Sequence, residues 1–339
     1  MSLKNKSVLV TGGAGFIGSH LVDRIVKEAP EKVIIVDNFF LGKQRNIGQA
    51  LKNENVKLYY QDAAHYEKML NIFEVEGVDV VFNLAVIPLL TSHELPKITC
   101  EDNINITLTS LELLRKGYYE TLIHCSSSEA YGTAVTIPMD EKHPLNPTTP
   151  YAASKAASDL LVMSYRSTFG IDMSIARPFN NYGPRQNEGS YAGVIPITIK
   201  RILSKQAPII YGDGLQTRDY IFVADTVDGF IKIYNNKITR GKVINIASGR
   251  EIQISELVKI IAEIMNYSGV IDYQKPRMAD VRRHRGDITL AEKLIEFKPS
   301  VNFEEGLRKT IEWYRNYFQN AMKDEGIKSK DVNKHTKDS

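Results

Sequence analysis

Short apolar runs alternate with segments of helical period along the first half of the chain. Runs of mostly apolar residues, each bounded by turn residues, occur at 7–11, 32–37, 56–60, 78–85, 121–127 and 172–178. Between them lie stretches such as FIGSHLVDRIV, in which apolar residues recur every three or four positions, as on one face of a helix. Nearly continuous apolar strands separated by helices predict a parallel sheet that is covered on both faces. We therefore expect an α/β fold with a Rossmann-like doubly wound parallel sheet.

The pattern changes after about residue 180. Glycine and tyrosine become frequent in FNNYGPRQNEGSYAG, and the later strands are short. Helices are expected at VIPITIKRIL, TVDGFIKIY, SELVKIIAEIM and FEEGLRKTIEWYRNYF. We predict a Rossmann-like domain over residues 1–179, rejoined at about 213–240, and a smaller C-terminal lobe over 180–320. Residues 323–339 hold few apolar side chains and predict a disordered tail.

Charge and composition narrow the classes of function. The 43 Lys and Arg residues are scattered among 40 Asp and Glu residues, so the chain lacks the concentrated basic surface that nucleic-acid binding needs. No segment offers about 18 consecutive apolar residues, and the start, MSLKNKSVLVTGGAGF, lacks a leader-like apolar core, which predicts a cytoplasmic protein that binds no membrane. Cys100 and Cys125 are expected to be reduced thiols. The seven histidines show no metal-ligand spacing, and we predict no metal site.

A glycine-rich turn follows the first expected strand. In TGGAGFIG, Gly12, Gly15 and Gly18 have the spacing that lets a turn be tight, a backbone approach a pyrophosphate, and a helix pack on a strand. Asp37 closes the second strand, where a carboxylate accepts hydrogen bonds from an adenosine ribose. A carboxylate there repels a 2′-phosphate, so the pattern favours NAD over NADP. The alternative is an ordinary strand-to-helix turn with a solvated aspartate.

A second motif opens the helix expected at PYAASKAASDLL. Thr149 is in capping position, Pro150 follows, and Tyr151 and Lys155 are four residues apart on one helix face. A free tyrosine titrates near pH 10, so a tyrosine base at neutrality needs its phenolate stabilised by roughly 4 kcal/mol. A lysine one turn away and a positive nicotinamide ring can supply that field. Ser127, at the end of the preceding strand, would hold the same substrate hydroxyl.

These residues resemble the extended short-chain dehydrogenase/reductases, in particular the NAD-dependent nucleotide-sugar epimerases and dehydratases. The resemblance runs from about residue 5 to residue 318 and rests on TGGAGFIG, VVFNLA, SSSEAYG, PYAASK, RPFNNYGPRQ, GDGLQTRDYIFVAD and RMAD. It implies tightly held NAD that is reduced and reoxidised within one turnover. It also implies a small substrate lobe and a homodimer formed through the helices near 97–115 and 151–169.

The resemblance assigns roles to individual residues. Tyr151 resembles the base that takes the proton of the sugar 4-hydroxyl, with Lys155 as its electrostatic partner and Ser127 as the third member. Contacts to the sugar diphosphate are implied for Asn180, Arg218 and Arg277. Arginine suits this role because its planar guanidinium can bind two phosphate oxygens at once. Contacts to the cofactor are implied for Gly12, Gly15, Phe16, Ile17, Gly18, Asp37, Asn38, Asp62, Ala63, Leu84, Ala85, Tyr151 and Lys155.

Two positions depart from the family pattern. Asn83 stands where many members carry histidine, so the sequence does not define the hydrogen bonds that this position makes toward the cofactor. Ala279 stands in RMAD where glycine is frequent, so the local turn is also open.

Glu129, in HCSSSEAYG, distinguishes among the reactions of the family. Oxidation at C4 acidifies the C5 proton, which a nearby carboxylate can remove. The resembling epimerases typically lack an acid at this position, whereas the 4,6-dehydratases carry glutamate, often preceded by aspartate. Ser128 occupies the place of that aspartate, and serine is a poor acid, so Glu129 itself would return the proton to the departing 6-hydroxyl. We count Ser128 among the catalytic candidates.

Several functions therefore stay open at the level of the sequence. A 4,6-dehydratase acting on a nucleotide sugar, with a UDP-sugar favoured, is the leading interpretation. Ser-Glu pairs also occur in the resembling UDP-glucuronate decarboxylases, and a 4-epimerase is a third candidate. A non-enzymatic NAD-binding regulator on the same fold is a further alternative, although such proteins usually lose the tyrosine and lysine pair. Glu129 could also be a solvated residue at a strand end.

Overall fold

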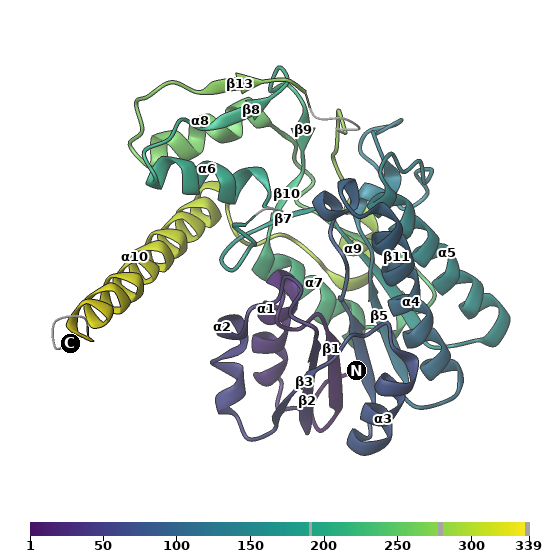
Figure 1. Cartoon of the computed structure of the whole chain (residues 1–339). Helices are drawn as coiled ribbons and strands as arrows, with labels where there is room; N and C mark the ends of the chain where they lie inside the picture. Colours follow the sequence, from purple (N-terminus) through teal and green to yellow (C-terminus); the bar gives the residue numbers. More distant parts are fainter. Residues whose placement is uncertain (190–191, 277–280, 336–339) are drawn as a thin grey trace.

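A seven-stranded parallel sheet forms the centre of the molecule (Figure 1). The structure, a computed structural model, describes residues 1–189, 192–276 and 281–335. The strand order is β11-β6-β5-β4-β1-β2-β3, and the chain reverses direction across the sheet after β3. The strands are β1 (Ser7–Thr11), β2 (Lys32–Asp37), β3 (Val56–Tyr60), β4 (Val80–Asn83), β5 (Thr121–Cys125), β6 (Met173–Pro178) and β11 (Val243–Ile246).

Alternate residues of the strands point to opposite faces of the sheet and form an apolar layer on each face. Val8 and Val10 of β1 pack into the core shared with helices α1 (Phe16–Val26) and α7 (Val223–Asn235). Leu9 and Ile34 point to the other face, which is covered by α3 (Tyr66–Glu76), α4 (Pro96–Arg115) and α5 (Pro150–Phe169). Since both faces are covered, the strands read as continuous apolar runs, and the doubly wound fold expected from the sequence is confirmed.

A third apolar cluster defines the smaller lobe. It contains α6 (Val194–Leu203), α8 (Ile254–Ile264) and the first turns of α10 (Phe303–His335), packed with the short strand β8 (Ile209–Tyr211). Five further short strands and two short helical segments lie in the smaller lobe or in the loops at the carboxyl edge of the sheet. They are β7 (Asn180–Tyr182), β9 (Thr217–Arg218), β10 (Tyr220–Phe222), β12 (Ile252–Gln253), β13 (Asp272–Gln274), η2 (Leu89–His93) and η3 (Ser128–Tyr131).

The sheet domain takes more of the second half of the chain than the sequence predicts. Helix α7 returns to the sheet within the expected region, packing beside α1. Strand β11 then pairs with β6, and α9 (Thr289–Ile295) packs in the same apolar core. The expected lobe over 180–320 is therefore interrupted. VINI, four residues long, forms a strand only because β6 offers it a free edge, which local pattern alone does not reveal.

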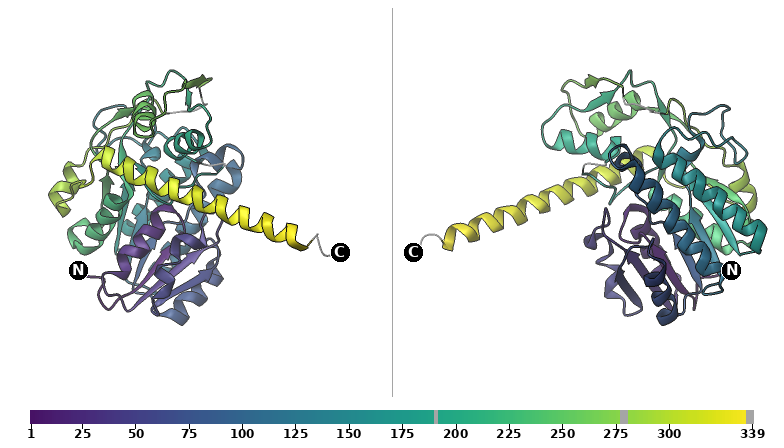
Figure 2. Two further views of the ribbon diagram at one scale, coloured as in Figure 1. Left: turned by 90° about the vertical axis from the view of Figure 1, so that its left-hand side faces the viewer. Right: turned by 45° about the vertical axis from the view of Figure 1, so that its right-hand side comes forward.

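Helix α10 is longer than the sequence predicts. It runs to His335 and projects from the body of the molecule (Figure 2). The disordered tail expected over residues 323–339 stays a prediction.

Among the described residues, none of the helices combines the length and apolar character needed to cross a membrane.

Candidate active site

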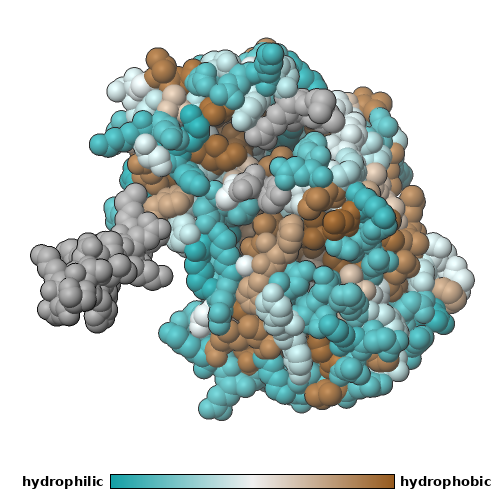
Figure 3. All heavy atoms as spheres, in the orientation of Figure 1, coloured by the Kyte–Doolittle hydropathy of each residue, from teal (hydrophilic) through white to brown (hydrophobic). Residues whose placement is uncertain are grey.

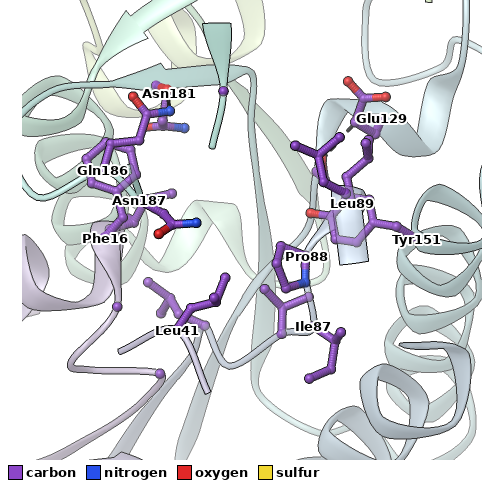
Figure 4. A pocket seen from close by; sticks show the side chains of 18 of the residues that line it. Phe16, Leu41, Ile87, Pro88, Leu89, Glu129, Tyr151, Asn181, Gln186 and Asn187 are labelled. Carbon is purple, nitrogen blue, oxygen red and sulfur yellow. Dashed lines mark hydrogen bonds between the residues drawn. The ribbon is translucent and has the colours of Figure 1, made fainter. Parts of the chain in front are cut away.

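One cavity of about 560 Å³ lies between the carboxyl ends of the sheet strands and the smaller lobe. Figure 4 shows its two sides. Phe16 and Leu41 of the sheet domain lie on one side near Gln186, and Tyr151 and Glu129 lie on the other. In doubly wound sheets ligands bind at this edge, where the strand order reverses.

The glycine turn closes one end of the cavity. Gly12 has φ of +67°, and a Cβ there would lie 2.9 Å from the backbone of Ala85. A Cβ on Gly18 would lie 2.1 Å from the carbonyl oxygen of Gly12. The turn therefore accepts no side chain at either position, and it leads directly into the amino end of α1. Amide groups at a helix start favour a phosphate, so the turn fits a pyrophosphate.

Asp37 lies at the end of β2, facing this turn. Its carboxylate accepts hydrogen bonds from the backbone N–H of Ala14 at 2.9 Å and of Phe39 at 2.8 Å. Burial raises the pKa of Asp37, and these two bonds oppose that effect. Beside it, the Asn38 amide donates to the Asp62 carboxylate at 3.0 Å. The residue expected to hold a ribose thus also fixes the glycine turn onto the second strand.

Tyr151 and Lys155 lie on the first turns of α5, where the capping prediction holds. The Thr149 hydroxyl accepts a hydrogen bond from the N–H of Ala152 at 3.2 Å, and Pro150 starts the helix. The Lys155 ammonium is buried and donates to the Cys125 carbonyl oxygen at 2.6 Å. Burial lowers the pKa of Lys155, and the charges of Cys125 and Asp159 oppose this shift.

The Tyr151 phenol reaches the cavity beside Ser127. Burial raises the pKa of Tyr151, and a hydrogen bond with the Ser127 hydroxyl lowers it by a smaller amount. The Glu129 charge adds to the rise, which places its carboxylate in the electrostatic field of the phenol. The protein groups around Tyr151 therefore do not by themselves lower the pKa of its phenol as a tyrosine base requires. Further positive charge is needed at the phenol for it to act as a base at neutral pH.

The η3 turn separates Ser128 from its neighbours. The Ser127 hydroxyl accepts a hydrogen bond from the N–H of Glu129 at 3.2 Å, and both residues line the cavity. Ser128 is only 2% exposed and is absent from the cavity wall. Successive side chains of such a tight turn point in different directions, so the structure does not bring Ser128 to the site as the sequence predicts.

The other predicted residues lie as follows. Asn180 and Arg218 line the cavity from the smaller lobe, and the Arg218 guanidinium donates to the carbonyl oxygen of Val281 at 2.5 Å. Arg277 and Ala279 lie outside the described residues. The predicted cofactor contacts all line this one cavity, namely Gly12, Gly15, Phe16, Ile17, Gly18, Asp37, Asn38, Asp62, Ala63, Leu84, Ala85, Tyr151 and Lys155.

Asn83 lies in a buried polar chain below the cavity. The Thr11 hydroxyl donates to Oδ1 of the Asn83 side chain at 2.7 Å, and Nδ2 of the same side chain lies 3.3 Å from His124 Nδ1. The same hydroxyl accepts from the N–H groups of Leu84 and Ala85 at 3.0 and 3.1 Å. The asparagine therefore joins strands β1, β4 and β5, and its partner Thr11 fixes the backbone that faces the cavity.

Residues 184–188 of the smaller lobe reach across to α1, a contact that the sequence did not predict. His20 Nε2 lies 2.9 Å from the carbonyl oxygen of Pro184, and Arg185 pairs with Asp23 at 2.7 Å. Burial lowers the pKa of His20 to about 4, so this side chain is neutral at neutral pH and can donate to the carbonyl. These contacts hold the segment over the start of α1.

The end of the same segment is held by charge. Glu188 forms ion pairs with Lys43 and, at 3.2 Å, with Arg45. Gln186 and Asn187 between these contacts line the cavity beside Phe16 (Figure 4). A ligand at the glycine turn would therefore be enclosed by both domains. Glu188 is more than 140 residues from Lys43 and Arg45 in the sequence, and no local motif marks these contacts.

A buried ion pair that the sequence analysis also missed lies behind the catalytic candidates. Arg177 of β6 donates to the Asp159 carboxylate at 2.7 Å, and both side chains are about 2–3% exposed. The one available signal was the spacing of Asp159, a further helical turn along the face that carries Tyr151 and Lys155. Among the described residues no group of three or more His, Cys, Asp or Glu side chains could hold a metal ion.

Comparison with known proteins agrees with this geometry. Residues 9–310 match the family model described as GDP-mannose 4,6 dehydratase. The UDP-glucose 4-epimerase of Mycolicibacterium smegmatis is 35% identical over 315 residues, which cover 92% of this chain and 99% of that protein. Other similar proteins include dTDP-D-glucose 4,6-dehydratases and UDP-glucuronic acid decarboxylases.

Solved structures give the same picture. The UDP-glucose 4-epimerase of Thermotoga maritima, solved with UDP-glucose, has 34% identity and a TM-score of 0.87, over 92% of this chain and 99% of that one. The dTDP-glucose 4,6-dehydratase of Streptomyces venezuelae, solved with NAD bound, has 29% identity and a TM-score of 0.87, over 91% and 97%.

Proposed function

Because the chain belongs to the NAD-dependent epimerase/dehydratase family of extended short-chain dehydrogenases, we propose that it is a nucleotide-sugar 4,6-dehydratase with a UDP-sugar as the favoured substrate. The observation that carries this proposal is the position of Glu129. Its side chain lines the cavity that Tyr151 and Ser127 also line, and its charge acts on the Tyr151 phenol.

The residues present fit NAD. Gly12 and Gly18 leave no room for a side chain where a pyrophosphate would approach, and α1 begins at that point. The Asp37 carboxylate faces the same turn and lines the cavity, where it would accept hydrogen bonds from an adenosine ribose. When bound, NAD would accept a hydride from C4 of the sugar and would supply it again at C6 after water has left.

Tyr151, Lys155 and Ser127 would act at the 4-hydroxyl. The Tyr151 oxygen takes the hydroxyl proton, while the Ser127 hydroxyl holds the same oxygen in line. Lys155 acts as a fixed positive charge because its ammonium is anchored on the Cys125 carbonyl. The result is a 4-ketone.

Glu129 would act next, at C5. Its carboxylate removes the C5 proton, and the electron pair of that C–H bond forms the C5–C6 double bond as the C6–O bond breaks. The same carboxyl group returns the proton to the departing hydroxyl, so that water leaves and Glu129 is again a carboxylate. The hydride taken from C4 would then be added at C6 while C5 takes up a proton from solvent, and the proton held by Tyr151 returns to solvent, so that the net change is loss of one water. A single acid/base group suffices for this step, which agrees with the burial of Ser128 away from the cavity.

A 4-epimerase is the second candidate, and a specific observation favours it. Epimerases of UDP-glucose stand among the most similar relatives and solved structures. That reaction needs the tyrosine, the lysine and a rotation of the ketone, but no base at C5. A decarboxylase is the third candidate, since a 4-ketone beside a C5 carboxylate loses carbon dioxide without an acid.

Product mass separates these candidates. The purified protein would be incubated with a panel of UDP-, dTDP-, GDP- and CDP-sugars and the products analysed by mass spectrometry and NMR. Loss of water supports the dehydratase, loss of carbon dioxide the decarboxylase, and unchanged mass with inverted C4 the epimerase. Binding of NAD without turnover of any sugar would favour a regulatory protein on the same fold and overturn the proposal.

We also propose that the protein is a homodimer formed through α4 and α5. The two helices pack side by side, and they carry the exposed apolar side chains of Ile98, Leu160 and Phe169. Figure 3 shows apolar surface on this side of the molecule. Light scattering should give twice the chain mass for the wild type, and Leu160→Glu should shift it toward the monomer. A monomeric wild type would refute this interface.

A further inference from the structure

The carboxylate of Asp159 is held by two partners in the protein interior. The same oxygen accepts a hydrogen bond from Arg177 at 2.7 Å and from the Ser126 hydroxyl at 2.5 Å. The Arg177 guanidinium also donates to Ser126 at 3.3 Å and lies 4.3 Å from the centre of the Tyr131 ring. Both charged side chains are thus fixed at two or more points.

This pair connects the elements that carry the proposed active site. Asp159 lies on α5, one helical turn beyond Lys155. Ser126 follows β5 and directly precedes Ser127, and its N–H donates to the carbonyl oxygen of Ala176 at 2.8 Å. The contact among Asp159, Arg177 and Ser126 therefore sets the distance between α5 and the loop that carries Ser127.

The second carboxylate oxygen of Asp159 is left without a hydrogen-bond partner in the structure. It lies 3.8 Å from His124 Nε2, which also has none. Burial lowers the pKa of His124 well below its usual range, and the charges of Lys155 and Arg177 lower it further. His124 is therefore neutral and does not form an ion pair with the Asp159 carboxylate.

We propose that Asp159 is a positioning residue that acts on the active site through Lys155. Its carboxylate lies one helical turn beyond the buried ammonium, where its negative charge favours the protonated lysine, and its bond with Ser126 fixes the loop that carries Ser127. The proposal rests on the function proposed above, because only a reaction with a tyrosine base requires the lysine charge.

The groups around Lys155 support this role. On its own helix it faces Tyr151 and Asp159, and on β5 it faces the thiol and carbonyl of Cys125 and the neutral His124. Burial lowers the pKa of Lys155, and the charges of Cys125 and Asp159 raise it. Burial also raises the pKa of the Cys125 thiol to about 11, which leaves it uncharged near neutrality. Asp159 is then the carboxylate whose charge opposes the lowering of the Lys155 pKa. The same charge raises the pKa of Tyr151, so any benefit to the phenol comes through the lysine.

A purely structural role is the alternative. A buried ion pair often adds little to stability compared with apolar side chains of similar volume, whereas removal of one partner leaves a costly unpaired charge. Loss of stability in a single variant therefore cannot identify the role. Asp159→Leu combined with Arg177→Met removes both charges without leaving either one unpaired, and it separates electrostatic action from packing.

The test follows the charge of Lys155 directly. NMR of isotope-labelled lysine side chains, with Lys155 assigned from its absence in Lys155→Met, gives its titration in the protein as purified. Asp159→Asn and the double variant should both lose the Lys155 charge at lower pH than the wild type, and Asp159→Glu should stay close to it. With the substrate found by product mass, kcat at neutral pH should fall at least about 10-fold while KM changes less than about twofold.

Glu76→Gln is the matched control. Glu76 is a buried carboxylate that binds Lys32 and Lys57 and a tyrosine hydroxyl, away from the cavity. It should lower stability and leave both the Lys155 titration and kcat unchanged. Wild-type titration of Lys155 in the double variant, with full kcat, would overturn the proposal. Since the titration needs no substrate, a failure of the proposed function would leave the NMR result standing and affect only the kinetic arm.

Discussion

The Lys155 ammonium lies 2.6 Å from the carbonyl oxygen of Cys125, so the helix that carries Tyr151 is joined to the end of β5 at the active site. This bond fixes the lysine below the cavity, one helical turn from the phenol. In the proposed reaction the lysine would act on Tyr151 through its electric field, because its hydrogen bond is to the backbone of Cys125.

Tyr151→Phe should fold normally and lose turnover by at least about 100-fold, since the ring is kept and only the proton-accepting oxygen is removed. The measurement is kcat together with thermal unfolding. Tyr273→Phe, which alters an exposed tyrosine of the smaller lobe, is the control and should change neither value. Near-normal turnover by Tyr151→Phe would remove the phenol from its proposed role.

Asp37→Ala should weaken NAD binding and also lower the stability of the apoprotein. The carboxylate holds the N–H groups of Ala14 and Phe39, and each loses its acceptor in this variant. Asp37→Asn keeps one carbonyl oxygen for these bonds, so it should retain more stability while losing discrimination against NADP.

Calorimetric titration with NAD and NADP, alongside thermal unfolding of each variant, checks both effects. A wild-type protein that binds NADP more tightly than NAD would contradict the role given to Asp37.

His20 should make part of the stability depend on pH. Its pKa in the folded protein is about 4, below the usual value of 6.5, because burial disfavours the charged ring. Between these values the unfolded chain binds more protons, so stability rises with pH. The contribution is present above about pH 6.5 and is lost as the pH falls toward 4.

Urea unfolding of the wild type and of His20→Asn at several pH values from 4 to 7 tests this linkage. The variant should show a shallower dependence on pH, with the remainder due to other buried histidines such as His284, whose pKa burial lowers to about 3. Identical pH dependence in the two proteins would show that the contact of His20 with Pro184 does not couple to protonation.

The sequence predicts what is local. Six strands of the sheet are visible as mostly apolar runs, which burial on both faces explains for all of them except the edge strand β3. Tyr151 and Lys155 are visible because a helix places residues four apart on one face. Strand β11 is not visible, since its four residues become a strand only by pairing with β6.

The same distinction holds in the site. The pairing of Asp159 with Arg177 depends on the packing of α5 against β6, and the contacts of Glu188 depend on the placement of two domains. Ser128 illustrates the opposite error. Its neighbours in the motif reach the cavity, but the direction of its own side chain is set by the turn and not by the spacing of the motif.

Glu129→Gln should separate the proposed dehydratase from its alternatives, because it keeps the size of the side chain and removes the base at C5. In heavy water the wild type should place solvent deuterium at C5 of the product, and the variant should release no dehydrated product and incorporate no deuterium there. Glu67→Gln, at an exposed position on α3, should behave as the wild type. Unchanged turnover and isotope incorporation in Glu129→Gln would refute the role of the carboxylate, whereas epimerised product without deuterium at C5 in both proteins would establish the second candidate, since that reaction never breaks the C5–H bond.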